Sequence, residues 1–111
     1  MILDRKQGRH REVTVSQLAA LLRSDGAIVV DVREPDEFAS GHIPGAINMP
    51  LSEFRASQLP DPGDKLLVLN CAAGRRSALA LDKCATARAE IDTHLAGGFG
   101  AWRSAGLAVE S

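Results

Sequence analysis

Cys71 is the residue of this sequence whose surroundings best equip it for covalent chemistry. The apolar run of residues 66–69 precedes it and is typical of a strand buried on both faces of a parallel sheet. The small residues 72–74 allow the backbone to turn tightly, and the composition from about residue 75 to residue 89 is typical of a helix. The sequence therefore predicts a strand, a cysteine, a tight loop and a helix in direct succession.

The loop after this cysteine is predicted to hold a negative charge. A loop that enters a helix N-terminus points backbone N–H groups inward and adds the positive end of the helix dipole. A free thiol has a pKa near ~8.5, and such a setting with nearby arginines lowers it to roughly 3.5 to 7.5. Two arginines in the expected first turn oppose the dipole, so we expect an anionic group between them. The candidate binding loop around Cys71 consists of Ala72, Ala73, Gly74, Arg75, Arg76 and Ser77.

Asp31 and Arg33 form a second candidate group. They end the predicted buried strand 27–31, and in parallel α/β sheets the ligand crevice lies at this carboxyl edge. We therefore expect them near the cysteine loop. In the favoured interpretation Asp31 accepts backbone hydrogen bonds and Arg33 pairs with Glu34 or Glu37, which supports the loop from behind. The alternative is direct contact with a substrate.

Length and composition predict one domain. The chain has 111 residues, of which 45% are hydrophobic, with residues 1–11 expected as a flexible tail and 12–111 as the domain. A net charge of −1 gives no reason to expect nucleic acid or an anionic membrane as a partner. Two cysteines without a spaced histidine pair argue against a metal site and favour reduced thiols in the cytoplasm. No apolar run approaches the ~20 residues of a membrane span.

The remaining pattern predicts an α/β fold. Five strands alternating with helices indicate a small open parallel sheet with helices on both faces. Ser16 is the expected N-cap of the first helix, and Pro35 the expected start of the second. The other strands are expected at 13–15, 46–49 and 91–95, a short helix at 50–54, and a closing helix that includes Phe99 and Trp102.

Three further features are predicted to be structural. His42, within the turn 41–45, is expected to make structural hydrogen bonds rather than to act as a general base. Cys84 lies about nine residues into its helix, which favours a buried structural cysteine over a resolving thiol. Gly97 and Gly98 are expected to let the backbone pass close to a neighbouring segment.

Four motifs in one order connect these features to a known family. They are C-A-A-G-R-R-S at 71–77, D-V-R-E-P-D-E-F at 31–38, G-H-I-P-G-A-I-N at 41–48 and L-A-G-G-F-G-A-W at 95–102. Together they resemble a single-domain rhodanese, a sulfurtransferase, over residues 14–109. The resemblance implies that Cys71 takes sulfane sulfur from thiosulfate or a persulfide donor, carries it as a persulfide, and passes it to cyanide or a thiol without a cofactor.

Side chains in the loop bear on the choice of donor. Ala72 and Ala73 supply no side-chain hydrogen-bond donors, so an anionic donor would depend on backbone N–H groups and on Arg75 or Arg76. A protein persulfide donor is equally compatible. Two other functions remain open: a non-catalytic interaction module, and a phosphatase or arsenate reductase of related architecture. Such phosphatases space cysteine and arginine as C-x5-R, whereas position 77 here is serine.

Overall fold

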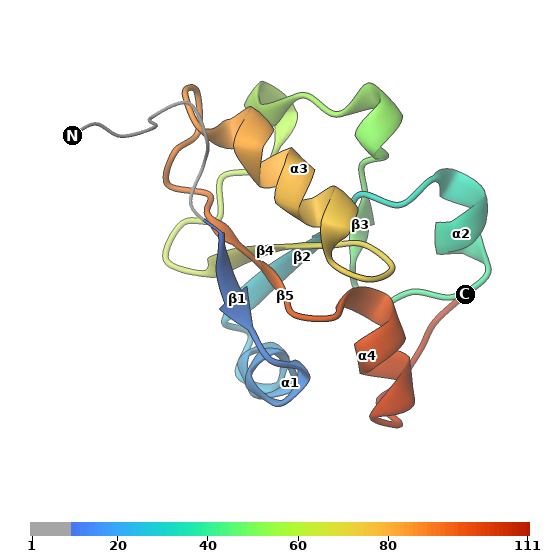
Figure 1. Cartoon of the computed structure of the whole chain (residues 1–111). Helices are drawn as coiled ribbons and strands as arrows, with labels where there is room; N and C mark the ends of the chain where they lie inside the picture. Colours follow the sequence, from blue (N-terminus) through green and yellow to red (C-terminus); the bar gives the residue numbers. More distant parts are fainter. Residues whose placement is uncertain (1–9) are drawn as a thin grey trace.

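A five-stranded parallel sheet runs through the middle of the protein in this computed structural model, which describes residues 10–111 (Figure 1). The strand order is β1-β5-β4-β2-β3, and every pairing is parallel. This confirms the predicted α/β sheet. The strands are β1 (Arg11–Val13), β2 (Ala27–Asp31), β3 (Ile47–Asn48), β4 (Leu66–Asn70) and β5 (Thr93–Leu95).

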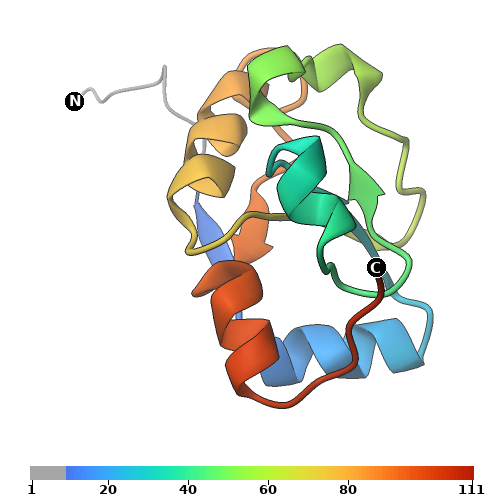
Figure 2. The ribbon, with the colours of Figure 1, turned by 90° about the vertical axis from the view of Figure 1, so that its right-hand side faces the viewer.

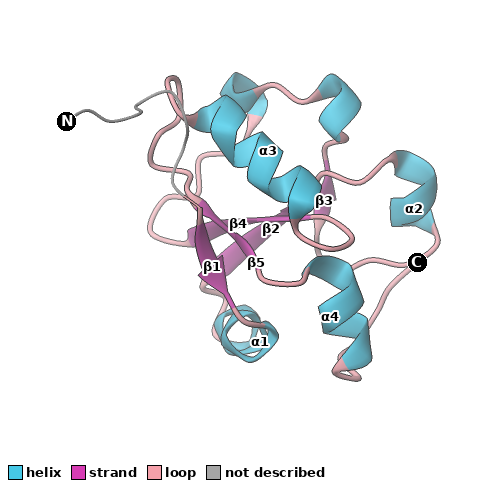
Figure 3. Cartoon of the chain, in the orientation of Figure 1, coloured by secondary structure: helices cyan, strands magenta, loops and turns pink. Residues whose placement is uncertain are grey.

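Helices cover both faces of the sheet, as the alternation of elements predicted (Figure 3). α1 (Val15–Arg23) and α4 (Gly98–Ser104) cover one face, and their buried residues share a core with Val29 and Val68. α3 (Arg75–Cys84) covers the other face together with the 3₁₀ helices η1 (Leu51–Glu53) and η2 (Ala56–Gln58). α2 (Pro35–Ala39) is a short helix near one edge, beside β3.

The central strands place the cysteine loop at the carboxyl edge of the sheet. β4 lies between β2 and β5, in register with β2 from Leu66 to Asn70. Its residues are almost all buried because helices lie on both of its faces, which is why its sequence is continuously apolar. Cys71 follows the last residue of this strand, so the end of the central strand fixes its backbone position.

Several element boundaries differ from those expected. β1 begins at Arg11 rather than residue 13, because it pairs with β5 from that residue on. The first helix is capped by Thr14 and not by Ser16: the Thr14 hydroxyl accepts from the Gln17 N–H at 3.1 Å, and the Gln17 side chain accepts from the Thr14 N–H at 2.9 Å. β3 and β5 are shorter than predicted.

α3 ends at Cys84, several residues before the predicted end near residue 89. The Arg88 guanidinium explains the early stop, because it donates to the carbonyl oxygens of Ala56, Leu59 and Pro60 at 3.0 to 3.2 Å. These bonds hold Arg88 against η2 and the two residues that follow it.

The two ends of the described chain lie at different parts of the fold. A flexible tail was expected at residues 1–11. Residues 1–9 lie outside the described part of the chain, and Arg11 belongs to β1. The C-terminal end reaches the segment after α2, where His42 and Glu110 form an antiparallel bridge (Figure 2). Among residues 10–111, no helix has the length and apolar character needed to cross a lipid bilayer.

Candidate active site

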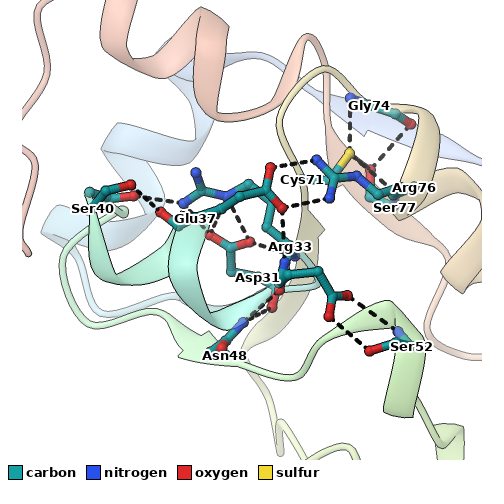
Figure 4. A network of polar contacts seen from close by, with 12 residues as sticks. Asp31, Arg33, Glu37, Ser40, Asn48, Ser52, Cys71, Gly74, Arg76 and Ser77 are labelled. Atoms are coloured by element: carbon teal, nitrogen blue, oxygen red, sulfur yellow. Dashed lines mark hydrogen bonds and ion pairs between the residues drawn. The ribbon is translucent and has the colours of Figure 1, made fainter.

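Cys71 lies inside a cradle of hydrogen-bond donors at the start of α3 (Figure 4). Its Sγ accepts from the backbone N–H of Gly74 at 3.1 Å and of Ser77 at 3.3 Å, and lies 3.5 Å from Ser77 Oγ. Gly74 makes the turn possible because its φ of 103° is one that side-chain-bearing residues rarely adopt. The loop predicted from the sequence therefore brings its N–H groups onto the sulfur.

These donors favour the thiolate form of Cys71. Burial raises the pKa of the thiol, but the hydroxyl and N–H of Ser77 and the N–H groups of Ala73 and Gly74 outweigh it and leave the pKa below the ordinary value. The second cysteine behaves oppositely: burial raises the pKa of Cys84 to about 11. A buried thiol at Cys84 is what the sequence predicted, and of the two thiols Cys71 is the one whose pKa is lowered.

The start of α4 holds the cysteine loop from the other side. The N–H groups of Phe99 and Gly100 donate to the carbonyl oxygens of Cys71 and Ala72 at 2.7 and 2.9 Å. Gly98 makes this approach possible, because a Cβ on it would lie 2.7 Å from the Ala72 carbonyl carbon. The predicted close approach at the glycine pair is therefore confirmed, and the neighbouring segment is the cysteine loop itself.

Arg76 faces a carboxylate from a distant element. Its guanidinium makes two bonds with Glu37 of α2, of 2.7 and 3.0 Å. The Arg76 hydrogen bond lowers the pKa of Glu37 to about 2, so the pair is fully ionised at neutral pH. Part of the anionic charge expected beside the arginines is thus supplied by the protein. Arg75 is exposed and forms no ion pair with the described residues.

Asp31 and Arg33 pair with each other at the end of β2 (Figure 4). Arg33 Nη2 lies 2.9 Å from Asp31 Oδ2, and the Arg33 N–H donates to Asp31 Oδ1 at 2.9 Å. The expected pairing of Arg33 with Glu34 or Glu37 is wrong, since Glu37 binds Arg76 and Glu34 accepts from Ser52. Asp31 and Arg33 are 0% and 5% exposed, which leaves little surface for direct substrate contact.

Removal of the Arg33 charge is expected to be costly. Arg33→Ala leaves the Asp31 carboxylate buried without its cation and removes the contact of the guanidinium with the Phe99 ring, 4.4 Å from its centroid. We expect a loss of about 3 to 5 kcal/mol in the free energy of unfolding, measured by urea denaturation. Lys65→Ala is the control, because it breaks the exposed pair with Asp25 and should cost no more than about 1 kcal/mol. Equal losses in the two variants would contradict the assignment.

A hollow of about 720 Å³ lies beside the loop, on the side of α3 that faces η1. Arg76 belongs to its wall, but Cys71, which is 1% exposed, does not. The hollow therefore does not open onto the Cys71 sulfur. The lining residues are Glu34, Leu51, Ser52, Arg76, Leu79, Asp82 and Lys83.

The sequence profile of the rhodanese-like domain family matches residues 14–105. The chain belongs to the rhodanese-like domain family. A thiosulfate sulfurtransferase named GlpE from Ectopseudomonas mendocina is 35% identical over 88 residues, which cover 79% of this chain and 81% of that protein. The structure of the human single-domain sulfurtransferase TSTD1 superposes on this rhodanese domain with a TM-score of 0.75, at 31% identity, over 84% of this chain and 95% of the human one.

A third relative is longer than this rhodanese domain. An uncharacterised protein of Synechocystis is 46% identical over 90 residues, which cover 81% of this chain but 50% of that protein. The chain thus spans about half the length of that relative. Membership in the family is shown for the rhodanese domain, residues 14–105.

Two residues of the rhodanese site were not singled out from the sequence. His94 on β5 places Nδ1 2.7 Å from Ser77 Oγ, and Glu37 was considered only as a partner of Arg33. The available signal for His94 was a histidine in a short predicted strand that is followed within three residues by the glycine pair. His42, by contrast, hydrogen-bonds the Phe38 carbonyl at 2.8 Å and stacks on the Phe38 ring, as a structural role would require.

Proposed function

We propose that this protein is a sulfurtransferase that moves sulfane sulfur through a persulfide on Cys71. The observation that carries the proposal is the position of Cys71 Sγ within a cradle of N–H donors in a rhodanese domain. The same donors that favour a thiolate can hold the terminal sulfur of a persulfide, which is also anionic. Both cysteines are free, so the reaction suits a reducing compartment such as the cytoplasm.

The proposed reaction has two displacement steps. In the first, the Cys71 thiolate attacks the outer sulfur of thiosulfate, a new S–S bond forms, and the old S–S bond breaks with its electrons on departing sulfite. In the second, cyanide or a thiolate attacks the outer sulfur of the persulfide, and Cys71 leaves as the thiolate. With a persulfide donor the leaving group is a thiolate instead of sulfite. Neither step requires a metal ion or an organic cofactor.

Intact-mass measurement tests the proposal directly. Incubation with thiosulfate should add the mass of one sulfur atom to the wild-type protein, and cyanide should remove it. Cys84→Ala should gain the same mass, because its substitution leaves the loop intact. If thiosulfate adds nothing, the same measurement with glutathione persulfide tests the second donor class; no gain with either donor would contradict the proposal.

Glu37 is expected to weaken the use of small anionic donors. Its carboxylate neutralises Arg76 beside the site, so Glu37→Gln should lower the KM for thiosulfate by about 3- to 10-fold, because the freed guanidinium then attracts the dianion. The contribution of this ion pair to folding stability has the pH dependence that a lowered pKa requires. It is fully present above the unfolded pKa of 4.5 and is lost as the pH falls through the folded pKa of about 2.

Glu90→Gln provides the matched control for this prediction. Glu90 also pairs with an arginine, Arg88, but lies beyond the C-terminal end of α3, away from the loop. Steady-state kinetics should give this variant the wild-type KM for thiosulfate. Arg76→Ala should raise KM, and a lower KM in that variant would contradict the electrostatic explanation.

A further inference from the structure

A line of buried polar groups runs from Cys71 through Ser77 to His94 on β5. Ser77 Oγ lies 3.5 Å from Cys71 Sγ and 2.7 Å from His94 Nδ1. Ser77 is 0% exposed and His94 is 4% exposed. α3 positions the serine, and β5, which pairs with the strand before the cysteine, positions the histidine. Side chains from the loop after β4, from α3 and from β5 are thus linked in one series of polar contacts.

The Ser77 hydroxyl has one proton and several acceptors within reach. These are Cys71 Sγ, His94 Nδ1 and the Gly74 carbonyl oxygen, the last at 3.2 Å. With Nδ1 unprotonated, the shortest of these contacts holds the Ser77 proton on the histidine side, and Oγ can only accept from the thiol. With Nδ1 protonated, His94 donates to Oγ, and the Ser77 proton is released to bind the thiolate; this is the arrangement in which the hydroxyl stabilises the thiolate and lowers the pKa of Cys71.

We propose that Ser77 and His94 form a proton relay that generates the Cys71 thiolate. The thiol proton passes from Sγ to Ser77 Oγ while the original hydroxyl proton passes from Oγ to His94 Nδ1. The S–H bond breaks, an N–H bond forms, and the serine ends with one proton as it began. The product is a thiolate and an imidazolium joined by the serine, a pair without net charge, which a buried site tolerates better than an isolated thiolate.

The charges around His94 suit this role. Nε2 faces the Glu12 carboxylate of β1 at 3.6 Å, and the His10 ring, itself bonded to Asp82 at 2.8 Å, lies edge-on with its centroid 6.1 Å away. Burial lowers the pKa of His94, Glu12 raises it and His10 lowers it, with a net decrease. The lowered pKa favours the neutral imidazole, which can accept a proton, and the Glu12 carboxylate stabilises the imidazolium once it has formed. On the thiolate side, the charged neighbour is Arg76.

The rate of alkylation by neutral iodoacetamide, measured from pH 5 to 9, tests the relay. The relay rests on the proposed role of Cys71 as the nucleophile, but this measurement needs no sulfur donor, so it can fail independently of the transfer reaction. His94→Asn keeps a hydrogen-bonding group near Ser77 that cannot take a proton. Its thiolate pKa should rise by about one unit, so alkylation at pH 6 falls about tenfold and converges with wild type near pH 9.

His42→Asn is the matched control, because His42 bonds the Phe38 carbonyl instead of Ser77, and it should follow the wild-type profile. An unchanged pH profile in His94→Asn would overturn the relay. Faster alkylation at pH 6 would also overturn it, since it would mean that His94 only withholds the Ser77 proton from the thiolate.

Two further measurements keep the test decisive if His94→Asn does not fold. Glu12 is half exposed, and Glu12→Gln should shift the alkylation profile in the same direction by about 2- to 3-fold at pH 6. Coupling between two groups is reciprocal, so in Cys71→Ser the His94 ring should lose its proton at a lower pH than in wild type, as followed by histidine NMR. An unchanged His94 titration in that variant would contradict the relay.

Discussion

Cys71→Ser is expected to abolish sulfur transfer while the protein remains folded. Serine can accept the same N–H bonds from Gly74 and Ser77, so the loop keeps its shape. A hydroxyl cannot form a persulfide, and kcat/KM for thiosulfate with cyanide should fall at least about 10³-fold, to the background rate. Circular dichroism and a cooperative melting curve would show that the fold is retained.

Cys84→Ala separates a general effect of thiol removal from the loss of the nucleophile. Cys84, the last residue of α3, is 0% exposed, and its raised pKa keeps it protonated at neutral pH. This variant should lose some stability, because a buried group is removed, yet it should retain transfer activity within about twofold. Residual turnover in Cys71→Ser, or loss of turnover in Cys84→Ala with the fold intact, would contradict the assignment of Cys71.

Among the glycines of residues 10–111, Gly98 is expected to be the one at which substitution by alanine is most damaging. The residue has a φ of 62°, which costs an alanine about 1 to 2 kcal/mol. The added Cβ also meets the backbone of Cys71 and Ala72, where nothing flexible can move aside, and overpacking of this kind costs about 1 to 3 kcal/mol more. The sum, about 2 to 5 kcal/mol, is a large part of the stability of a domain this size.

Gly63→Ala isolates the backbone part of that cost. Gly63 has a φ of 63°, but no atom lies within 4 Å of its added Cβ. Urea denaturation should show a loss of about 1 to 2 kcal/mol for Gly63→Ala and a larger loss for Gly98→Ala. Only Gly98→Ala should also reduce transfer activity, because the added methyl group pushes the cysteine loop away from the N–H groups of Phe99 and Gly100. Equal losses would mean that the contact with the loop is unimportant.

Local sequence was sufficient to predict the central part of the site. The apolar run of β4, the small residues after Cys71 and the helix-forming residues beyond them lie next to one another in the chain, so their order specifies the loop. The close approach at Gly98 was also predictable, because paired glycines in a structured segment usually serve a backbone contact.

The choice of partner among several charged or polar residues could not be predicted. Arg33 has acidic residues at four nearby positions, 31, 34, 36 and 37, and composition alone does not show which of them binds it. Asp31 does, because it is the last residue of β2 and Arg33 lies two residues after it. Glu37 and Arg76 are 39 residues apart, and only the packing of α2 near α3 brings them together. His94 was missed for the same reason, since its partner Ser77 lies on another element.

The attachment of α4 to the cysteine loop has an optical consequence. Trp102, the single tryptophan of the chain, lies on α4 three residues after Phe99, whose N–H binds the Cys71 carbonyl. It is 4% exposed, and its indole N–H donates to the Ala108 carbonyl at 2.8 Å. A change at the sulfur that shifts the loop will move this helix, so the intensity and wavelength of tryptophan fluorescence provide a label-free, stopped-flow signal for loading and unloading of Cys71.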